Sequence, residues 1–258
     1  MTVAAHPTAV IDPGCQLGLN VEIGPYTVVG PAVEMGDGCR VGPHAVLQQN
    51  VRLGPAVTVG AGAVVGGAPQ DLKFRGEDTW VEIGARSILR EHCTVNRATA
   101  AAGTTRIGAD CLLMAYVHVA HDCQIGDGVS IANATQLSGH VTVEERATLS
   151  GLIAIHQFVT IGTWAFVGGA SRVNQDIPPY VKAVGNPVEL YGLNTIGLQR
   201  ADFCPATISA LKRAYRLLFN THLARSRALA ELAPVAAQYA EVRRLIDFVS
   251  TARRGVPA

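Results

Sequence analysis

The sequence predicts a mainly β protein: a solenoid of short parallel strands followed by a small helical region. Three observations predict it. Aliphatic residues recur at every sixth position, glycine often follows them directly, and a small or β-branched residue often stands four positions after them. A period of six fits neither an α-helix nor a long strand, whose side chains repeat every 3.6 and every two residues. It fits short strands separated by tight corners, so that three hexapeptides form one triangular coil.

The aliphatic frame extends over most of the chain, with two interruptions. From Ile107 to Val173 every sixth residue is aliphatic. We expect the aliphatic and the small residues to point inward, and successive coils to pair as parallel strands about 4.8 Å apart. The frame consists of Ile11, Leu17, Ile23, Val29, Met35, Val41, Leu47, Leu53, Val59, Val65, Ile83, Leu89, Val95, Ile107, Leu113, Val119, Ile125, Ile131, Leu137, Val143, Leu149, Ile155, Ile161, Val167 and Val173.

This pattern resembles that of the hexapeptide-repeat left-handed β-helices, and the left hand is implied by that resemblance alone. It is an exception to the usual right-handed crossover of parallel strands. Glycine after the aliphatic residue is expected at corners where a side chain would collide or where φ must be positive. Five of the six cysteines occupy the small inward position, which indicates core filling: Cys15, Cys39, Cys93, Cys111 and Cys123.

The repeat predicts two domains. Residues 1–187 are expected to form the β-helix, with loops ejected near 68–80 and 97–106, where the frame is lost. Loops on a rigid scaffold often carry function. Beyond Pro178 and Pro179 the repeat ends, and apolar residues such as Ile208 and Leu211 follow helical spacing. Residues 188–258 are therefore expected to form a helical domain that covers the open strand edges of the last coil.

Composition excludes several classes of protein. The net charge is +1 and no basic run resembles a nucleic-acid patch. No apolar stretch approaches the roughly 18 residues of a membrane span, and the N-terminus lacks a charged-then-apolar signal. The cysteines show no CxxC or metal spacing. We therefore expect a cytoplasmic protein with reduced thiols and no integral membrane contact.

Stacking arithmetic predicts a candidate site, because residues separated by three hexapeptides lie above one another on adjacent coils. Three histidines, an aspartate and a glutamine converge on one strip. His121 stands two places after the inward Val119, so its side chain should point outward. An outward strip on a flat face is no pocket, which favours a homotrimer whose second subunit supplies the other wall. The rows are His121, Gly139 and Gln157; Asp122, His140 and Phe158; and Ser138 and His156.

Two other interpretations of these histidines stay open. The first is that the histidines only line a polar interface between the subunits of a catalytically inert scaffold, which fits their positions as well as an active site does. Trimeric hexapeptide proteins of the γ-carbonic-anhydrase type resemble the predicted prism and bind zinc through three histidines across a subunit boundary, two of them five positions apart on one coil. Here His118 and His121 are three apart, and His140 lies beside Asp122 on the next coil. Zinc accepts nitrogen ligands, so a zinc-dependent enzyme of that type is an alternative.

Five segments together resemble the acyl-[acyl-carrier-protein]:UDP-N-acetylglucosamine O-acyltransferases, the family that opens lipid A synthesis. They are Ala-Pro-Gln-Asp-Leu-Lys-Phe (68–74), His-Val-Ala-His-Asp-Cys (118–123), Ser-Gly-His (138–140), Ile-His-Gln-Phe (155–158) and Gln-Asp-Ile-Pro-Pro-Tyr-Val (175–181). The resemblance extends from about His6 to the C-terminal helices. It implies a homotrimer that transfers a 3-hydroxyacyl chain from acyl carrier protein (ACP) to the 3-hydroxyl of UDP-N-acetylglucosamine. It implies no metal and no cofactor besides the phosphopantetheine arm of the donor.

The resemblance also implies roles for individual residues. His121 is the expected general base, to which an imidazole with an ordinary pKa near 6.5 is suited. Asp122 is expected to support it, and the Gly139 N–H to stabilise the oxyanion. Gly169 matches the position that limits acyl length; because glycine leaves that channel open, we expect a chain of about the length of 3-hydroxymyristate. The expected substrate contacts are Asp71, Lys73, His118, His140, His156, Gln157, Asn194 and Arg200.

The chain departs from the family pattern at three places. Ile196 replaces an acidic residue and Ala201 a second basic one, so nucleotide contacts are expected to be fewer or different. Asn96-Arg-Ala-Thr stands where Arg-Gly-Thr is usual. Acylation of the 3-amino analogue of the sugar stays an alternative. So does the later N-acyltransferase of the same pathway, although that enzyme normally carries an additional N-terminal domain and here the repeat begins by Ile11.

Overall fold

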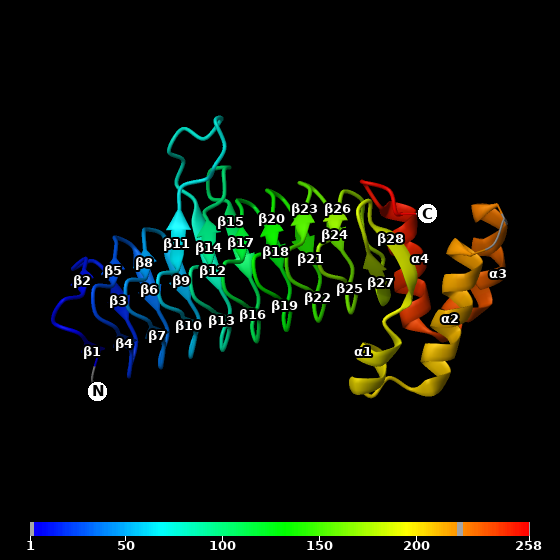
Figure 1. Cartoon of the computed structure of the whole chain (residues 1–258), viewed down its shortest axis with the longest axis horizontal. Helices are drawn as coiled ribbons and strands as arrows, with labels where there is room; N and C mark the ends of the chain where they lie inside the picture. Colours follow the sequence, from blue (N-terminus) through cyan, green and yellow to red (C-terminus); the bar gives the residue numbers. More distant parts are fainter. Residues whose placement is uncertain (1–2, 221–223, 258) are drawn as a thin grey trace.

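The predicted fold class is confirmed: the chain is a left-handed parallel β-helix followed by α-helices (Figure 1). The structure is a computed structural model that describes residues 3–220 and 224–257. In it the strands are two to five residues long and form the three faces of a prism. The helices gather at the C-terminal end of that prism.

Each face is one sheet, and we name the three faces A, B and C in the order in which the chain meets them. Face A contains β1 (Ala4–Ala5), β4 (Glu22–Ile23), β7 (Arg40–Val41), β10 (Thr58–Val59), β13 (Ile88–Leu89), β16 (Leu112–Leu113), β19 (Ser130–Ile131), β22 (Thr148–Leu149), β25 (Phe166–Val167), β27 (Val181–Val184) and β28 (Glu189–Leu193). Face B contains β2 (Val10–Ile11), β5 (Val28–Val29), β8 (Val46–Leu47), β11 (Val64–Gly67), β14 (Thr94–Asn96), β17 (His118–Val119), β20 (Gln136–Leu137), β23 (Ala154–Ile155) and β26 (Arg172–Val173). Face C contains β3 (Gln16–Leu17), β6 (Val33–Met35), β9 (Val51–Leu53), β12 (Trp80–Ile83), β15 (Thr104–Ile107), β18 (Gln124–Ile125), β21 (Thr142–Val143) and β24 (Thr160–Ile161).

The register follows the predicted spacing. Val119 lies opposite Leu137, which lies opposite Ile155, so adjacent coils are offset by three hexapeptides. The aliphatic frame fills the interior from Ile23 onward, and Ile11 and Leu17 pack against it at the N-terminal end. Burial of these side chains removes apolar area from water along the whole prism, which is the main force that holds the coils together.

The cysteines confirm the core-filling interpretation. Cys39, Cys93, Cys111 and Cys123 are buried, and Cys15 is partly buried against the core. Burial raises the pKa of Cys93 to about 11 and that of Cys123 to about 12, which keeps both thiols protonated at neutral pH.

The corners differ from expectation in where the left-handed backbone falls. It falls three residues after the aliphatic position and mostly on residues other than glycine, such as Tyr26 (φ 57°) and His44 (φ 58°). Most glycines directly after the aliphatic residue serve the close approach of coils, whereas Gly66 has a positive φ of 83°. At Gly36, for example, a Cβ would lie 2.7 Å from the backbone nitrogen of Pro55 on the next coil. Of the two reasons expected for these glycines, collision is therefore the one that applies at Gly36.

Two loops leave the prism at the same edge, between faces B and C (Figure 1). The first loop spans residues 68–79 and the second spans 97–103. Residues 80 and 104–106, expected within the loops, belong instead to β12 and β15, where they extend the pairing of these strands.

The two loops are tied to each other and to the coils. The side-chain nitrogen of Asn96 donates a hydrogen bond to the carbonyl of Ala68 (3.0 Å). The backbone nitrogen of Arg97 donates to the carbonyl of Gly67 (2.9 Å). Ala102 donates to the carbonyl of Asp78 (2.9 Å). The base of the second loop therefore supports the first.

The C-terminal helices form a second core. They are α1 (Thr195–Arg200), α2 (Pro205–Phe219), α3 (Arg225–Gln238) and α4 (Ala240–Thr251). Leu198, Leu211 and Leu245 are among their buried residues. Among the described residues, no helix is long and apolar enough to cross a membrane. β28 pairs antiparallel with β27 and lies beyond residue 187, so the division into domains at that residue stays a prediction.

Two sets of polar contacts attach the C-terminal part to the prism. Arg244 on α4 contacts Glu145 (2.6 Å) and Glu144 (3.1 Å) at the edge between faces C and A. The buried carboxylate of Asp176 accepts hydrogen bonds from the backbone nitrogens of Thr160 (2.7 Å) and Arg254 (3.0 Å). The end of the chain is thus fixed to the last coils.

Candidate active site

The predicted rows of polar residues lie at the edge between faces B and C, on the same edge as the two loops. His121 and Asp122 follow β17, and Gly139 and His140 follow β20. The backbone nitrogen of His140 donates to the carbonyl of His121 (3.0 Å), which fixes the two corners one above the other. The strip was expected on a flat face. It lies at a corner instead, because β17 and β20 are each only two residues long and the chain has already turned at His121.

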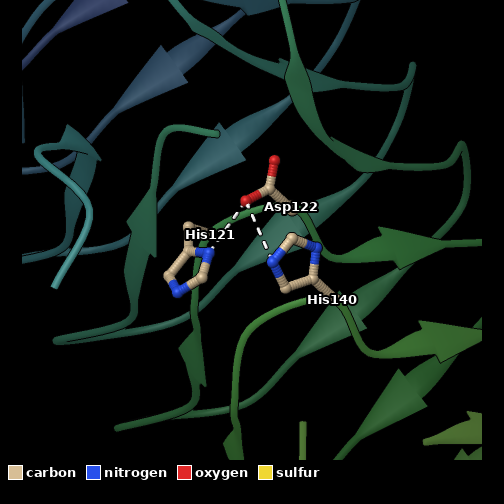
Figure 2. A group of neighbouring side chains, drawn as sticks. All are labelled: His121, Asp122 and His140. Atoms are coloured by element: carbon tan, nitrogen blue, oxygen red, sulfur yellow. Dashed lines mark hydrogen bonds and ion pairs between the residues drawn. The ribbon is translucent and has the colours of Figure 1, made fainter. Parts of the chain in front are cut away.

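His121 and Asp122 form a hydrogen-bonded pair (Figure 2). Nδ1 of His121 lies 2.8 Å from Oδ2 of Asp122. Burial would raise the pKa of Asp122, but hydrogen bonds from Thr99 and His121 outweigh it and hold the pKa below its ordinary value. An ionised carboxylate only accepts, so Nδ1 of His121 must carry the hydrogen. The lone pair of the neutral ring is then on Nε2, where it is free to take a proton.

The carboxylate of Asp122 has further partners in the second loop. The hydroxyl of Thr99 donates to Oδ2 (2.7 Å), and the backbone nitrogen of Thr99 lies 3.2 Å from both carboxylate oxygens. The backbone nitrogen of Asp122 donates to the hydroxyl of Thr105 (2.8 Å). The side chains of His121 and Asp122 are only 13% and 15% exposed, so these bonds are partly shielded from water.

Gly139 accommodates the ring of His121. A Cβ on Gly139 would lie 2.6 Å from Nε2 of His121 and 2.9 Å from Nδ1, so any side chain would displace the imidazole. The backbone N–H of Gly139 has no acceptor among the described residues. The equivalent position at the same edge of earlier coils is proline in Pro13 and Pro31, which shows that the coil does not need this N–H. The group is available to a ligand.

His118 precedes the pair by three positions, on β17. Its Nδ1 lies 2.7 Å from the hydroxyl of Thr94, the residue opposite it on β14. Burial lowers the pKa of His118, and the neighbouring His121 lowers it further. The imidazole of His118 is therefore neutral at pH 7.

The next coil adds exposed groups along the same edge. His140 packs edge-on against His121, with ring centroids 5.2 Å apart, and stacks on Phe158 at 4.5 Å. His156 and Gln157 are exposed beside Phe158, and Nδ1 of His156 donates to the Gln157 carbonyl (3.1 Å). The structure thus brings His121, His140 and His156 to one edge, as the stacking of coils predicted, and His118 lies next to them on β17.

Asp71 and Lys73 lie in the first loop, which projects from that edge (Figure 1). Oδ1 of Asp71 accepts a hydrogen bond from the backbone nitrogen of Lys73 (2.8 Å), which shapes the turn. The side chain of Lys73 is exposed, and Leu72 between them is 96% exposed. A single exposed apolar side chain is ordinary at a protein surface, so Leu72 by itself identifies no binding surface.

Three predicted residues lie on other edges of the same chain. Gly169 is in the corner between faces A and B. Asn194 caps α1: its Oδ1 accepts from Gly197 (3.2 Å) and its Nδ2 donates to the carbonyl of Trp164 (3.0 Å), in the corner between faces C and A. Arg200 is exposed at the end of α1. Within this chain, therefore, these three residues do not lie beside His121.

Sequence reasoning missed the threonines that hold the site. Thr94 stands 24 positions before its partner His118, and Thr99 stands 23 before Asp122, so neither fits the spacing of an ordinary coil. The insertion in the second loop displaces them. The loss of the frame at 97–106 was the signal, but it did not tell which loop residue returns to the coil.

A metal ion has one candidate position among the described residues. Ligand atoms of His121, Asp122 and His140 lie within 4.8 Å of one another. Oδ2 of Asp122 is already the acceptor for His121 and Thr99, so a metal there would displace these hydrogen bonds. The three side chains could supply zinc ligands of the right type, at the expense of the pair described above.

Two protein-family models match the chain. The model described as bacterial transferase hexapeptide (six repeats) matches residues 32–67 and 104–139. The model described as Udp N-acetylglucosamine O-acyltransferase, domain 2, matches residues 176–257.

Curated relatives and solved structures match over nearly the whole chain. The chain is 54% identical over 255 residues to the acyl-[acyl-carrier-protein]–UDP-N-acetylglucosamine O-acyltransferase of Sulfurihydrogenibium sp., covering 98% of this chain and 94% of that protein. It is 46% identical over 252 residues to the protein of the same name from Thiobacillus denitrificans, covering 97% and 98%. The crystal structure of a UDP-N-acetylglucosamine acyltransferase from Bacteroides fragilis superposes with a TM-score of 0.95 at 37% identity, covering 98% and 99% of the two chains.

Proposed function

This chain belongs to the family of acyl-[acyl-carrier-protein]–UDP-N-acetylglucosamine O-acyltransferases, and we propose that it transfers a 3-hydroxyacyl chain from acyl-ACP to the 3-hydroxyl of UDP-N-acetylglucosamine, the first step of lipid A synthesis. The observation that supports this most directly is the His121–Asp122 pair, whose ring lies against Gly139. The pair offers a base on Nε2, and Gly139 offers a free N–H beside it.

The reaction is acyl transfer from a thioester to an alcohol. Nε2 of His121 takes the proton of the sugar hydroxyl while the hydroxyl oxygen attacks the carbonyl carbon of the thioester. The oxyanion that forms is stabilised by a backbone donor, for which we propose the N–H of Gly139. The carbon–sulfur bond then breaks, and the protonated imidazole returns its proton to the departing thiolate of the pantetheine arm. The carboxylate of Asp122 stabilises the imidazolium in between.

The remaining polar residues of the edge are proposed as substrate contacts. His118 and His140 flank the base, and His156 and Gln157 continue the strip onto the next coil. Asp71 and Lys73 on the first loop would hold the sugar and a phosphate, because an exposed ammonium is an ordinary phosphate partner. No cofactor is proposed besides the phosphopantetheine arm carried by the donor.

A homotrimer would complete the site. Asn194 and Arg200, the proposed nucleotide contacts, and Gly169, the proposed limit to acyl length, lie on edges away from His121. If each edge faces a neighbouring subunit, residues of two chains meet around one substrate. Both the trimer and the cytoplasmic location stay predictions from the sequence. At the nucleotide, Ile196 is exposed on α1 where the family carries an acid, which favours altered uridine contacts.

Transfer from 3-hydroxymyristoyl-ACP to UDP-N-acetylglucosamine tests the proposal, with native protein compared with His121→Ala. We expect native transfer to the 3-hydroxyl, and a loss of about two orders of magnitude or more in the variant. His44→Ala is the matched control, because His44 stacks on Tyr26 at the edge between faces A and B. That variant should keep the native rate.

Each alternative gives a different result. Transfer only to the 3-amino analogue would change the acceptor and keep the family. Stoichiometric zinc, with activity lost on chelation, would favour the metal-dependent alternative at His121, Asp122 and His140. Unchanged transfer in His121→Ala would refute the role given to that residue.

A further inference from the structure

The carboxylate of Asp122 lies between two imidazoles. Figure 2 shows its Oδ2 facing both His121 and His140, at 2.8 Å from Nδ1 of the first and 3.7 Å from Nε2 of the second. Only the shorter distance is a hydrogen bond. Nδ1 of His121 and Nε2 of His140 both face Oδ2 of Asp122. A small rotation of the carboxylate would therefore exchange one hydrogen-bond partner for the other.

Thr99 is the residue that restricts this rotation. Its hydroxyl and its backbone nitrogen both reach the carboxylate, at 2.7 Å and 3.2 Å. Two donors from one residue hold a carboxylate in one orientation, whereas a single donor leaves it free to turn. The backbone of Asp122 is held separately, because its nitrogen donates a 2.8 Å hydrogen bond to the hydroxyl of Thr105 on β15.

The contact between Thr99 and Asp122 is made by an insertion in the coil, the second loop. Thr94 on β14 lies opposite His118 on β17, so the loop adds one hexapeptide to the three of an ordinary coil. Its base is fixed by Arg97, whose backbone nitrogen donates to Gly67, and its far end by Ala102, which donates to Asp78. A loop anchored at both ends presents Thr99 to the coil in a defined position.

We propose that Thr99 is a positioning residue that keeps Asp122 on His121 and away from His140. The inference rests on the proposed function of His121 as the base. In this arrangement Thr99 selects the tautomer of His121 that bears hydrogen on Nδ1, and so leaves Nε2 free for the sugar hydroxyl. Thr99 itself contacts no substrate in this proposal, so its loss should affect turnover and spare substrate binding.

The test compares Thr99→Val, which removes the hydroxyl at similar size, with Thr99→Ser, which keeps it. We expect Thr99→Val to lower kcat by about tenfold or more, the range for a hydrogen bond to a charged group. KM for both substrates should stay within about twofold, and Thr99→Ser should recover most of the native kcat. Thr104→Val is the matched control, because it makes the same substitution at the first residue of β15, directly after the same loop, and Thr104 does not contact Asp122.

The nitrogen shifts of ¹⁵N-histidine-labelled protein read the His121 tautomer without any substrate. In Thr99→Val we expect the Nδ1–H form of His121 to lose population, while Thr104→Val leaves it unchanged. This readout tests Thr99 even if the native protein transfers no acyl chain, so failure of the proposed function is seen separately. A native kcat and tautomer in Thr99→Val would overturn the proposal, as would a raised KM with unchanged kcat. If valine prevents folding, Thr99→Ala takes its place.

Discussion

The ring of His121 occupies the space that a side chain on Gly139 would need, one coil further along the prism. The backbone of Gly139 does not have the positive φ that favours glycine, so alanine is compatible with its conformation. Substitution at this position therefore acts on the imidazole and leaves the coil able to form.

We predict that Gly139→Ala lowers kcat by about two orders of magnitude, because a displacement of about 1 Å in a catalytic group has effects of that size. The melting temperature should change little by comparison. The control is Gly14→Ala at the same edge of the first coil, where the nearest atom is the flexible carboxylate of Asp12. Native turnover in Gly139→Ala would show that the position of the ring is not critical.

His118 should make stability depend on pH just below neutrality. Its folded pKa lies below the ordinary value of about 6.5, mainly through burial. Between these two pH values the unfolded chain binds the extra proton, so stability is complete above pH 6.5 and falls as the pH falls. Asp122 acts in the same direction, but only below about pH 3.9, because its pKa is depressed from that value.

The measurement is the denaturation midpoint between pH 5 and pH 8. We expect His118→Gln to flatten the decline below pH 6.5. His44→Gln, at another edge, is the control and should keep the native slope. A His118→Gln protein with the native pH dependence would mean that another group produces the decline.

Arg244 should contribute to the attachment of the helices. It contacts Glu144 and Glu145, but its side chain is 42% exposed, so solvent screens the pair. We expect Arg244→Met to lower the free energy of unfolding by about 1 kcal/mol, the upper end for a solvent-exposed ion pair. Urea titration measures this. Arg40→Met, which loses a more exposed contact to Glu22 at 3.5 Å, should have a smaller effect.

Gly169 should set the length of the acyl chain. It is exposed, and a Cβ there would lie 3.2 Å from the carbonyl oxygen of Gly151, which requires a small local adjustment. We expect Gly169→Met to lower the kcat/KM preference for the fourteen-carbon over the ten-carbon donor by about tenfold or more, because even a single methylene in an apolar pocket can change kcat/KM by that much. Gly169→Ala is the milder control. A native protein that prefers the ten-carbon donor would refute the assignment.

The coils could be predicted from the sequence because the position of a residue in the repeat determines its face, its direction and its neighbours on the adjacent coils. Once Val119, Leu137 and Ile155 are recognised as one inward row, the neighbours of each follow by counting, and His121 falls beside Gly139. This works because strands pair only with the adjacent coil and the inward aliphatic residue recurs at every sixth position of each coil. Tertiary contact is here a matter of spacing in the chain.

Features that depend on segments outside the six-residue repeat, or on side-chain contacts, could not be predicted. Thr99 reaches Asp122 from a loop, and no register specifies which loop residue returns to the coil. The corner location of His121 depends on strands of only two residues, a length that the repeat alone does not reveal. Asn194 matches a nucleotide contact of the family, yet its side chain caps α1, a role visible only from the bonds it makes.

The two loops interrupt the coils without altering their phase. Val51 lies opposite Val81 across the first loop and Thr94 opposite His118 across the second, so the insertions add two hexapeptides and one to the three of an ordinary coil. After each, the next aliphatic residue again points inward. Insertions of whole hexapeptides at this edge therefore keep the coils on either side in phase. A single residue gained within a strand does not, because it turns the side chains that follow from the interior to water.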